Sequence, residues 1–470
     1  MNSSSIPSAE RKQVIDKLTS SSTEFDRKLG FFDALMVVIG NVIGSGIFIA
    51  PAVVAATILP GTGGMVLLVW VVGGVLALTG ALSYSELGAL MPRAGGHYVF
   101  LREGLGSFTA FLYGWTILLV IASGSIAFVS ITFVTYLGYF IPMSSFVIKI
   151  VAVATIFLLT GVNYRGVKQG SFVLNIFTVL KVIALVVLVG AGLLFSDIRS
   201  ENFVPVLPNN SVFDLTIASA FLLALVSALF TYGGWQNIGF IAGELKNPRR
   251  NLPLALLVGT IVVIVIYVCT NTVYINVLSV EGMAQSKLVA SDTMEGLWGR
   301  IGGALISLLI IVSSFGITNA IILVSPRVTY AMAKDGVFFE SLSRVHSKYK
   351  TPSTALIFQA VWSSIIVFAS ETFQQIMNYV VFMDWLFLAL AVYCIFILRK
   401  KYPDAPRPYK VWGYPVIPIL FIVLSLIVVL NTLVRAPLES IIGTVIVLSG
   451  TPAYLFWKKR IEKNKQTTDV

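Results

Sequence analysis

One apolar stretch of the chain, Met36 to Ile49 (MVVIGNVIGSGIFI), contains residues that break a helix. Gly44, Ser45 and Gly46 lie near the middle of the longer apolar run over residues 31–57. Glycine is costly inside a helix, and in lipid an opened backbone is tolerated only where it faces protein or a water-filled cavity. The sequence therefore predicts exposed N–H groups at the start of a second half-helix, where an anion such as a carboxylate would bind.

A second break follows much later, in the sequence FTYGGW at residues 230–235. Paired interruptions in corresponding halves of a membrane chain point to the binding site of a transporter. Backbone carbonyls opened at Gly233 and Gly234 would accept bonds from an ammonium group. Phe230 is a candidate cover for this site and Trp235 a candidate support beneath it. Core packing is the alternative role of each aromatic ring.

Two of the charged residues within the apolar runs are candidates for a role in transport. Lys181, in NIFTVLKVIALVV, is a functional candidate because a lysine at membrane depth costs several kcal/mol unless it is paired or near water. It is interpreted as a fixed cation in the place of a coupling ion, as a proton carrier, or as a structural amine bonded to the carbonyls of a broken helix. Asp384 would face an outer vestibule, exchange protons or bond to a neighbouring helix.

Other polar residues have open interpretations. Ser313, Ser314 and Asn319 in the eighth apolar run would bond to a substrate, to Lys181 or to another helix. Glu86, at the end of the second run, would either latch an inner gate through a basic loop residue or lie as a single carboxylate at the interface.

The elements that must position these residues are membrane helices. The chain has 470 residues, of which 57% are hydrophobic and 12% charged, against about 25% charged in soluble proteins. Apolar runs long enough to cross a bilayer recur throughout the chain. Twelve spans are expected, over residues 31–57, 64–90, 105–140, 147–163, 171–195, 214–242, 252–276, 301–333, 353–371, 374–398, 414–434 and 437–457.

The net charge of +11 is distributed asymmetrically. With twelve spans, 26 of the 33 Lys and Arg residues lie in loops and tails on the side that holds both termini, five lie on the other side, and Lys181 and Arg327 lie within spans. The positive-inside rule makes the richer side cytoplasmic, which argues against nucleic acid binding. We therefore expect a multi-pass protein of the plasma (cell or inner) membrane with cytoplasmic termini.

The expected organisation follows from these spans. It comprises a weakly ordered cytoplasmic tail (1–29), a first group of five spans (30–195), an extracellular loop (196–213), a second group of five (214–398), a cytoplasmic loop (399–413), two peripheral helices (414–457) and a cytoplasmic tail (458–470). Cys269 and Cys394 lie within spans, so no disulfide framework is indicated. His97 and His346 lie in cytoplasmic loops, and no metal or other cofactor is expected.

Several motifs resemble those of a known family. GNVIGSGIF (40–48) resembles the signature of the amino acid–polyamine–organocation (APC) superfamily. YGGW (232–235), followed by GELKNPRRNLP (243–253), is similar to the L-type amino acid transporter (LAT) branch and its bacterial relatives. SELGALMPRAGGHY (85–98) and SFGITN…YAMAKDG (314–336) add two further matches. The resemblance covers residues 30–400 and has its motifs in the required order.

The resemblance implies an all-α, LeuT-like fold in which five spans are followed by five inverted spans and two peripheral ones. It implies a substrate between spans one and six, with its carboxylate near Ser45 and Gly46 and its α-amine near the carbonyls of Val42 and residues 230–233. The implied substrate-binding residues are Val42, Ile43, Gly44, Ser45, Gly46, Phe230, Thr231, Tyr232, Gly233 and Gly234. The gate candidates are Phe230 as the outer lid, Trp235, Glu86 and Asp384.

The resemblance also assigns a role to Lys181. It matches the family's fifth-span lysine, which takes the place of a sodium ion and bridges the first and eighth spans, and this favours sodium-independent transport. Two features depart from animal members. The loop at residues 141–146 lacks the cysteine that bonds to a glycoprotein subunit, so no disulfide-linked partner is expected. Asp384 stands where many animal members have Asn.

These observations predict a sodium-independent secondary transporter of neutral L-amino acids that works by alternating access, as an exchanger. A proton-coupled symporter and a cationic amino acid or polyamine permease remain alternatives. A non-transporting membrane amino acid sensor is an alternative of a different class. An enzyme is not expected, because the sequence has no metal cluster, no clustered carboxylates and no nucleophile elbow.

Overall fold

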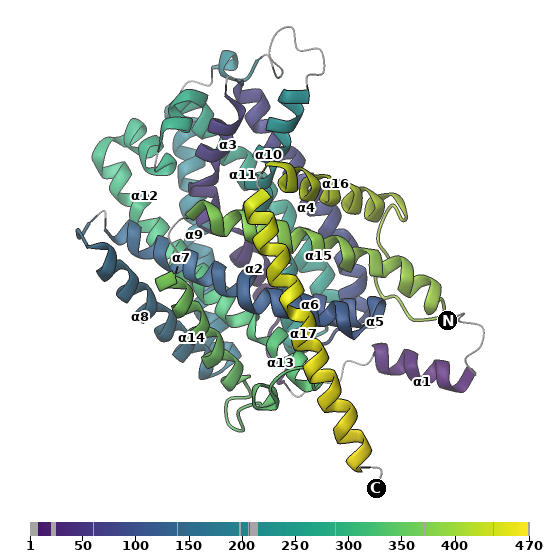
Figure 1. Ribbon diagram of the computed structural model, residues 1–470. Coiled ribbons are helices and arrows are strands. Elements are labelled where there is room, and N and C mark those ends of the chain that lie inside the picture. Colours follow the sequence, from purple (N-terminus) through teal and green to yellow (C-terminus); the bar gives the residue numbers. More distant parts are fainter. Residues whose placement is uncertain are drawn as a thin grey trace.

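The structure is a computed structural model that describes residues 8–19, 25–59, 61–138, 140–196, 199–204, 206, 215–286, 288–369, 373–435 and 437–468 (Figure 1). Within these ranges the regular structure is helical, apart from one isolated bridge between Leu29 and Leu245. The all-α class predicted from composition is confirmed.

Ten helical segments in the described ranges are long and apolar enough to cross a membrane, and two shorter apolar helices accompany them. The chain is therefore a polytopic membrane protein. The two shorter helices are α2 (Phe31–Val42) and α14 (Ser353–Ala369). The long helices are α4 (Gly63–Leu90), α8 (Ser145–Tyr164), α9 (Val167–Phe195), α11 (Pro248–Gln285), α12 (Val289–Val324), α15 (Phe373–Lys401), α16 (Val416–Arg435) and α17 (Pro437–Thr468), with kinks at Ser279 in α11 and Gly299 in α12.

Packing places the last two helices outside the others. In the bundle, α4 packs along α11, and α12 packs along α9 and α7 (Ala122–Leu137). By contrast, α17 runs across the outside of the bundle against α15 and α6 (Ser107–Thr116), and α16 packs on α15, α10 (Leu215–Tyr232) and α4 (Figure 1). Short helices make the remaining connections: α5 (His97–Leu105), α13 (Pro326–Lys334), η4 (Ser200–Asn202) and η6 (Glu340–Ser343).

Both predicted helix breaks are present. The first span stops at the end of α2, passes through the short helix η2 (Ser45–Phe48) and resumes as α3 (Ala50–Ile58). The sixth span stops at the end of α10 and continues as the 3₁₀ segment η5 (Trp235–Glu244). Between α10 and η5, Gly234 has a φ of +112°, a conformation that side chains disfavour.

The third apolar run, expected as one span over residues 105–140, is divided into several helical segments. Gly106, with a φ of +96°, ends α5 and begins α6. A π-helical turn, η3 (Ile117–Ile121), then joins α6 to α7. Such turns occur mainly as insertions within α-helices and often at functional sites, and in this protein η3 contributes to the cavity described below.

The N-terminal segment is more ordered than the weakly ordered tail that its polar sequence suggests. It contains α1 (Ser8–Thr19) and buries Leu18, Phe25 and Leu29. The backbone of Leu29 accepts a bond from Lys246 N–H (2.8 Å) and donates one to Glu244 C=O (3.1 Å). These long-range contacts cannot be read from local composition. Most of the loop expected at 196–213 lies outside the described residues.

A buried ion pair connects η5 to α13 at the end of the bundle where α1 and α13 lie (Figure 1). We call this the α13 end. Glu244, the last residue of η5, accepts from Arg327 on α13 through Nε (2.8 Å) and Nη2 (3.3 Å). Both side chains are essentially inaccessible, with exposed fractions of 0% and 1%. A buried ion pair leaves an uncompensated charge when one partner is removed, so η5 and α13 depend on each other.

Replacing Glu244→Gln should therefore lower the free energy of unfolding by about 3–5 kcal/mol, because Arg327 would remain buried without its counter-ion. The double variant Glu244→Leu/Arg327→Met removes both charges and should recover most of this loss. Thermal unfolding of the purified protein in detergent measures both effects. A single variant as stable as the wild type would show that the pair does not hold these elements together.

Candidate functional site

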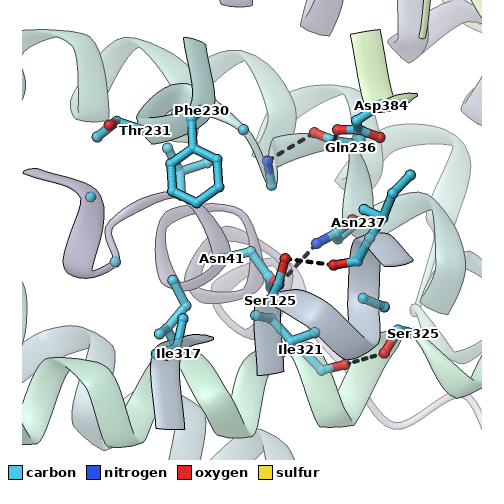
Figure 2. Close-up of a pocket in the computed structure, with 18 of the residues that line it drawn as sticks. Asn41, Ser125, Phe230, Thr231, Gln236, Asn237, Ile317, Ile321, Ser325 and Asp384 are labelled. Carbon is cyan, nitrogen blue, oxygen red and sulfur yellow. Dashed lines mark hydrogen bonds between the residues drawn. The ribbon is translucent and has the colours of Figure 1, made fainter. Parts of the chain in front are cut away.

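A cavity of about 110 Å³ lies where the two helix breaks meet (Figure 2). Its walls come from both breaks and from three further segments. The residues that line it are Asn41, Val42, Gly44, Ser45, Gly46, Ile117, Ile121, Ala122, Ser125, Phe128, Val129, Leu229, Phe230, Thr231, Gly233, Gly234, Gln236, Asn237, Phe240, Ile317, Ile321, Ser325, Asp384 and Trp385. Eight of the ten residues predicted to bind substrate are in this set, and Ile43 and Tyr232 are not.

The glycines allow the two breaks to approach each other closely. A Cβ atom on Gly46 would lie 2.9 Å from Thr231 Oγ1, and one on Gly234 would lie 2.5 Å from the backbone oxygen of Asn41. Contacts this short do not occur in real structures, so a larger residue at Gly234 requires the backbone to move, and one at Gly46 requires the Thr231 side chain to shift. The glycines thus bring the backbone of one broken span against that of the other.

The first helix break offers backbone donors to the cavity. Ser45 and Gly46 begin η2, and the first N–H groups of any helix lack an intrahelical acceptor. Both residues line the cavity, and Ser45 is otherwise buried. The cavity can therefore present N–H donors to an anionic group on one side.

Tyr267 on α11 joins the two breaks and was not identified from the sequence. Its buried hydroxyl lies 2.8 Å from the carbonyl oxygen of Val42, at the end of α2, and 3.3 Å from that of Thr231, near the end of α10. The single hydroxyl proton is donated to one carbonyl or shared between the two. A tyrosine in an apolar run gives no sequence signal for this role.

Lys181 on α9 also forms hydrogen bonds at the first break. Its buried amine donates to the carbonyl oxygens of Gly40 (2.6 Å) and Ile43 (2.5 Å). These are carbonyls that the interrupted helix leaves open. Ile43 therefore contributes to the break through Lys181 rather than by lining the cavity.

The eighth-span residues were predicted to bond to a substrate, to Lys181 or to another helix, and Asn319 bonds to other helices. The Ser313 and Ser314 hydroxyls are buried and have no hydrogen-bond partner among the described residues. Asn319 donates to the backbone of Gly170 (3.0 Å) and accepts from Asn163 (2.8 Å), so it connects α12 to α9 and α8. In the described structure, both hydrogen bonds of Lys181 go to the first span.

One wall of the cavity is polar (Figure 2). Gln236 Nε2 donates to Asp384 Oδ2 at 2.9 Å, and Gln236 Oε1 accepts from the N–H of Gly234 at 3.0 Å. Asn237 donates to Asn41 at 3.2 Å. Of these residues, the sequence pointed to Gly234 and Asp384 but not to Gln236 and Asn237. The feature that could have indicated these two amides is their position directly after the second break.

The four gate candidates occupy different environments. Phe230 lines the cavity and packs edge-on against Phe128, with ring centroids 5.8 Å apart. Asp384 lines the polar wall. Trp235 is buried outside the cavity, against Tyr84 at 5.6 Å.

Glu86 lies away from the cavity. Its carboxylate accepts from Arg399 at the end of α15 (2.6 and 2.8 Å) and from the N–H of Val411 (2.8 Å), and it lies 3.5 Å from Arg407. Glu86 therefore joins α4 to the end of α15 and the loop that follows, so the basic partners anticipated from the sequence are present.

The comparison with known families agrees with this geometry. Residues 29–454 match the family model described as amino acid permease, and the chain belongs to this family. It is an amino acid permease of the APC superfamily rather than an enzyme.

Curated relatives cover nearly the whole chain. The serine/threonine exchanger SteT of Bacillus subtilis is 34% identical over 92% of this chain and 97% of its own length. The b(0,+)-type amino acid transporter 1 of Mus musculus is 30% identical over 97% and 95%, respectively. The large neutral amino acids transporter small subunit 2 of Mus musculus is 31% identical over 92% and 82%. The predicted resemblance to LAT-type transporters is confirmed.

Gly234→Ala should reduce transport at least about tenfold, because the new Cβ would need a disfavoured φ and would collide with the Asn41 carbonyl oxygen. Gly161→Ala is the matched control, since nothing lies within 4 Å of its added Cβ. Initial uptake rates in proteoliposomes, normalised to folded protein, measure the effect. Equal rates for the two variants would contradict the close-approach argument.

Tyr267→Phe should weaken substrate binding roughly two- to tenfold, the range expected for loss of one hydrogen bond of about 0.5–1.5 kcal/mol. Tyr274→Phe provides the control, because the buried Tyr274 hydroxyl has no partner among the described residues. The apparent substrate affinity of each variant is measured from the dependence of uptake on substrate concentration. If both behave alike, Tyr267 does not organise the breaks.

Proposed function

We propose that this permease is a sodium-independent exchanger of neutral L-amino acids that works by alternating access. The observation that carries the proposal is the amine of Lys181, bonded to two carbonyls of the first helix break beside the cavity. Family membership and the exchange activity in the name of the SteT relative support it. The name of another relative, the large neutral amino acids transporter small subunit 2, supports neutral amino acids as substrates.

The cavity offers complementary groups for both charges of an amino acid. The substrate carboxylate would accept from the N–H groups of Ser45 and Gly46, as anions do at helix starts. The α-ammonium would donate to carbonyls of Val42 and of residues 230–233. The Val42 carbonyl also accepts from Tyr267, so substrate and tyrosine would meet at the same oxygen. Phe230 would cover the bound substrate as the outer lid.

A fixed ammonium explains independence from sodium. Carbonyls opened by a broken membrane helix often coordinate a coupling cation. Here Lys181 supplies a positive charge that is covalently attached and cannot dissociate with the substrate. With no coupling ion to carry, net movement would depend on return of the carrier with a second amino acid, which is exchange.

The setting of the protein is part of the proposal. We place it in the plasma membrane, with the α13 end and both termini cytoplasmic, because that side is rich in Lys and Arg. The arrangement of spans one to five and six to ten is proposed to be an inverted repeat. We also infer that no partner is disulfide-linked, because Cys269 and Cys394 lie in α11 and α15 and residues 141–146 contain no cysteine.

Counterflow in proteoliposomes tests this function. Uptake of labelled neutral amino acids should require unlabelled amino acid in the lumen and should be unchanged when choline replaces sodium. Uptake into empty vesicles driven by sodium or protons would instead indicate a symporter. Binding by folded protein without any flux would indicate a sensor.

Lys181→Ala should abolish counterflow or uncouple it, because the carbonyls of Gly40 and Ile43 would lose their donor. Lys149→Ala is the control: this half-buried lysine on α8 also bonds to a carbonyl, that of Phe368, but its hydrogen bond is exposed. Rates and coupling are measured after confirming that each variant is folded. Wild-type counterflow in Lys181→Ala would remove the basis of the proposal.

A further inference from the structure

Asp384 is a carboxylate in the cavity wall that has no cationic partner in the part of the chain that the structure describes. Its residue is only 7% exposed, yet it lines the cavity. Among the described residues, no lysine, arginine or histidine forms an ion pair or hydrogen bond with it, and its hydrogen bond is the one from Gln236. The proposed exchange of neutral substrates does not use this group.

The orientation of the Gln236 amide is determined by its two bonds. Its Oε1 accepts from the N–H of Gly234, so its Nε2 is the atom that faces Asp384 (Figure 2). A carboxylate has about four acceptor positions, and Gln236 uses one. The others are available to a donor in the cavity. The second helix break thus holds Asp384 in place through Gln236.

The neighbours of Asp384 provide no compensating charge. Tyr84 on α4 and Tyr113 on α6 interact electrostatically with Asp384, and the ordinary pKa of a phenol is about 10, so both are neutral. Behind them on α5, burial lowers the pKa of His97 to about 3, so its ring is neutral. The amine of Lys181 is engaged at the first break.

The other elements packed against α15 present uncharged groups near Asp384. Phe421 of α16 packs on Trp385 at 5.7 Å, and Gly443 of α17 adjoins Met383. The cavity-lining residues of η3, α7, α10 and η5 are also uncharged: Ile117, Ile121, Ala122, Ser125, Phe128, Val129, Leu229, Phe230, Thr231, Gln236, Asn237 and Phe240.

An ionised carboxylate in such a place is costly unless a positive charge accompanies it. We propose that Asp384 takes up one positive charge in each loaded state: a proton when the substrate is neutral, and the side-chain ammonium when the substrate is a basic amino acid. The ammonium would form a charge-assisted hydrogen bond with the carboxylate. This inference rests on the proposed exchange function and extends its substrates to basic amino acids.

The proposal sets a charge balance that can be measured. When external lysine exchanges for internal serine, one lysine cation enters, and one serine zwitterion and one proton leave. The exchange is electroneutral, and the lumen becomes more alkaline. Serine-for-serine exchange should slow as pH rises, by about tenfold per unit once Asp384 is ionised, because the protonated fraction falls by that factor. Lysine uptake should not fall over the same range.

The experiment uses the full-length protein in vesicles that contain serine and a trapped pH dye. Adding external lysine should give labelled lysine uptake and lumenal alkalinisation together, and a membrane potential should not change the rate. Asp384→Asn should lose lysine uptake and the pH signal, and its serine exchange, whatever its rate, should no longer depend on pH. Asp384→Glu should retain lysine uptake and the pH signal at reduced rates.

Glu295→Gln is the control, since it removes an exposed carboxylate on α12 and should behave as the wild type. Potential-driven lysine uptake without alkalinisation would overturn the proposal, as would an Asp384→Asn variant that retains both signals. Wild-type serine exchange without any lysine uptake would also overturn it, while the exchange function would stand. Absence of wild-type serine exchange is a different result, because it would refute the proposed function itself.

Discussion

A backbone that is interrupted within a membrane must find partners for its N–H and C=O groups in the protein itself. In this permease that requirement organises the centre of the bundle. Lys181 from α9 donates to the carbonyls of Gly40 and Ile43, while the single hydroxyl proton of Tyr267 from α11 is donated to the carbonyl of Val42 or shared with that of Thr231. Two helices that are not broken thus satisfy carbonyls of the two that are, and the groups left over face the cavity.

Close approach of the two breaks follows from their glycines and makes the cavity a single site. A Cβ at Gly234 would collide with the backbone of Asn41, and one at Gly46 would collide with the side chain of Thr231, so the two broken spans are in direct contact. A movement of one break is therefore transmitted to the other. The buried ion pair of Glu244 and Arg327 connects the end of η5 to α13. Direct contacts therefore link the first break, the second break and α13, and the proposed alternating access would use these contacts.

The cavity is asymmetric in its chemistry. Backbone donors and acceptors from the two breaks suit the part common to all amino acids, whereas the wall formed by Gln236, Asn237 and Asp384 would contact what differs between them. Backbone groups recognise charge without regard to side chain, and side-chain polar groups discriminate because an unsatisfied buried donor or acceptor is costly. Substrate choice would accordingly depend on Asp384 more than on the glycine breaks.

The sequence by itself determined the membrane class, both helix breaks, the depth of Lys181 and the family, because hydropathy, glycine placement and isolated charge are local properties. Only the tertiary structure decided which groups meet. Tyr267 lies in the same kind of polar-poor surroundings as many residues with no role, and Val42 and Asp384, which bond to Tyr267 and Gln236, are far away in the chain. The N-terminal segment likewise gained its order from contact with η5. Trp235 and Glu86, although plausible gates from sequence, lie outside the cavity because side-chain direction depends on the packing of whole helices rather than on local pattern.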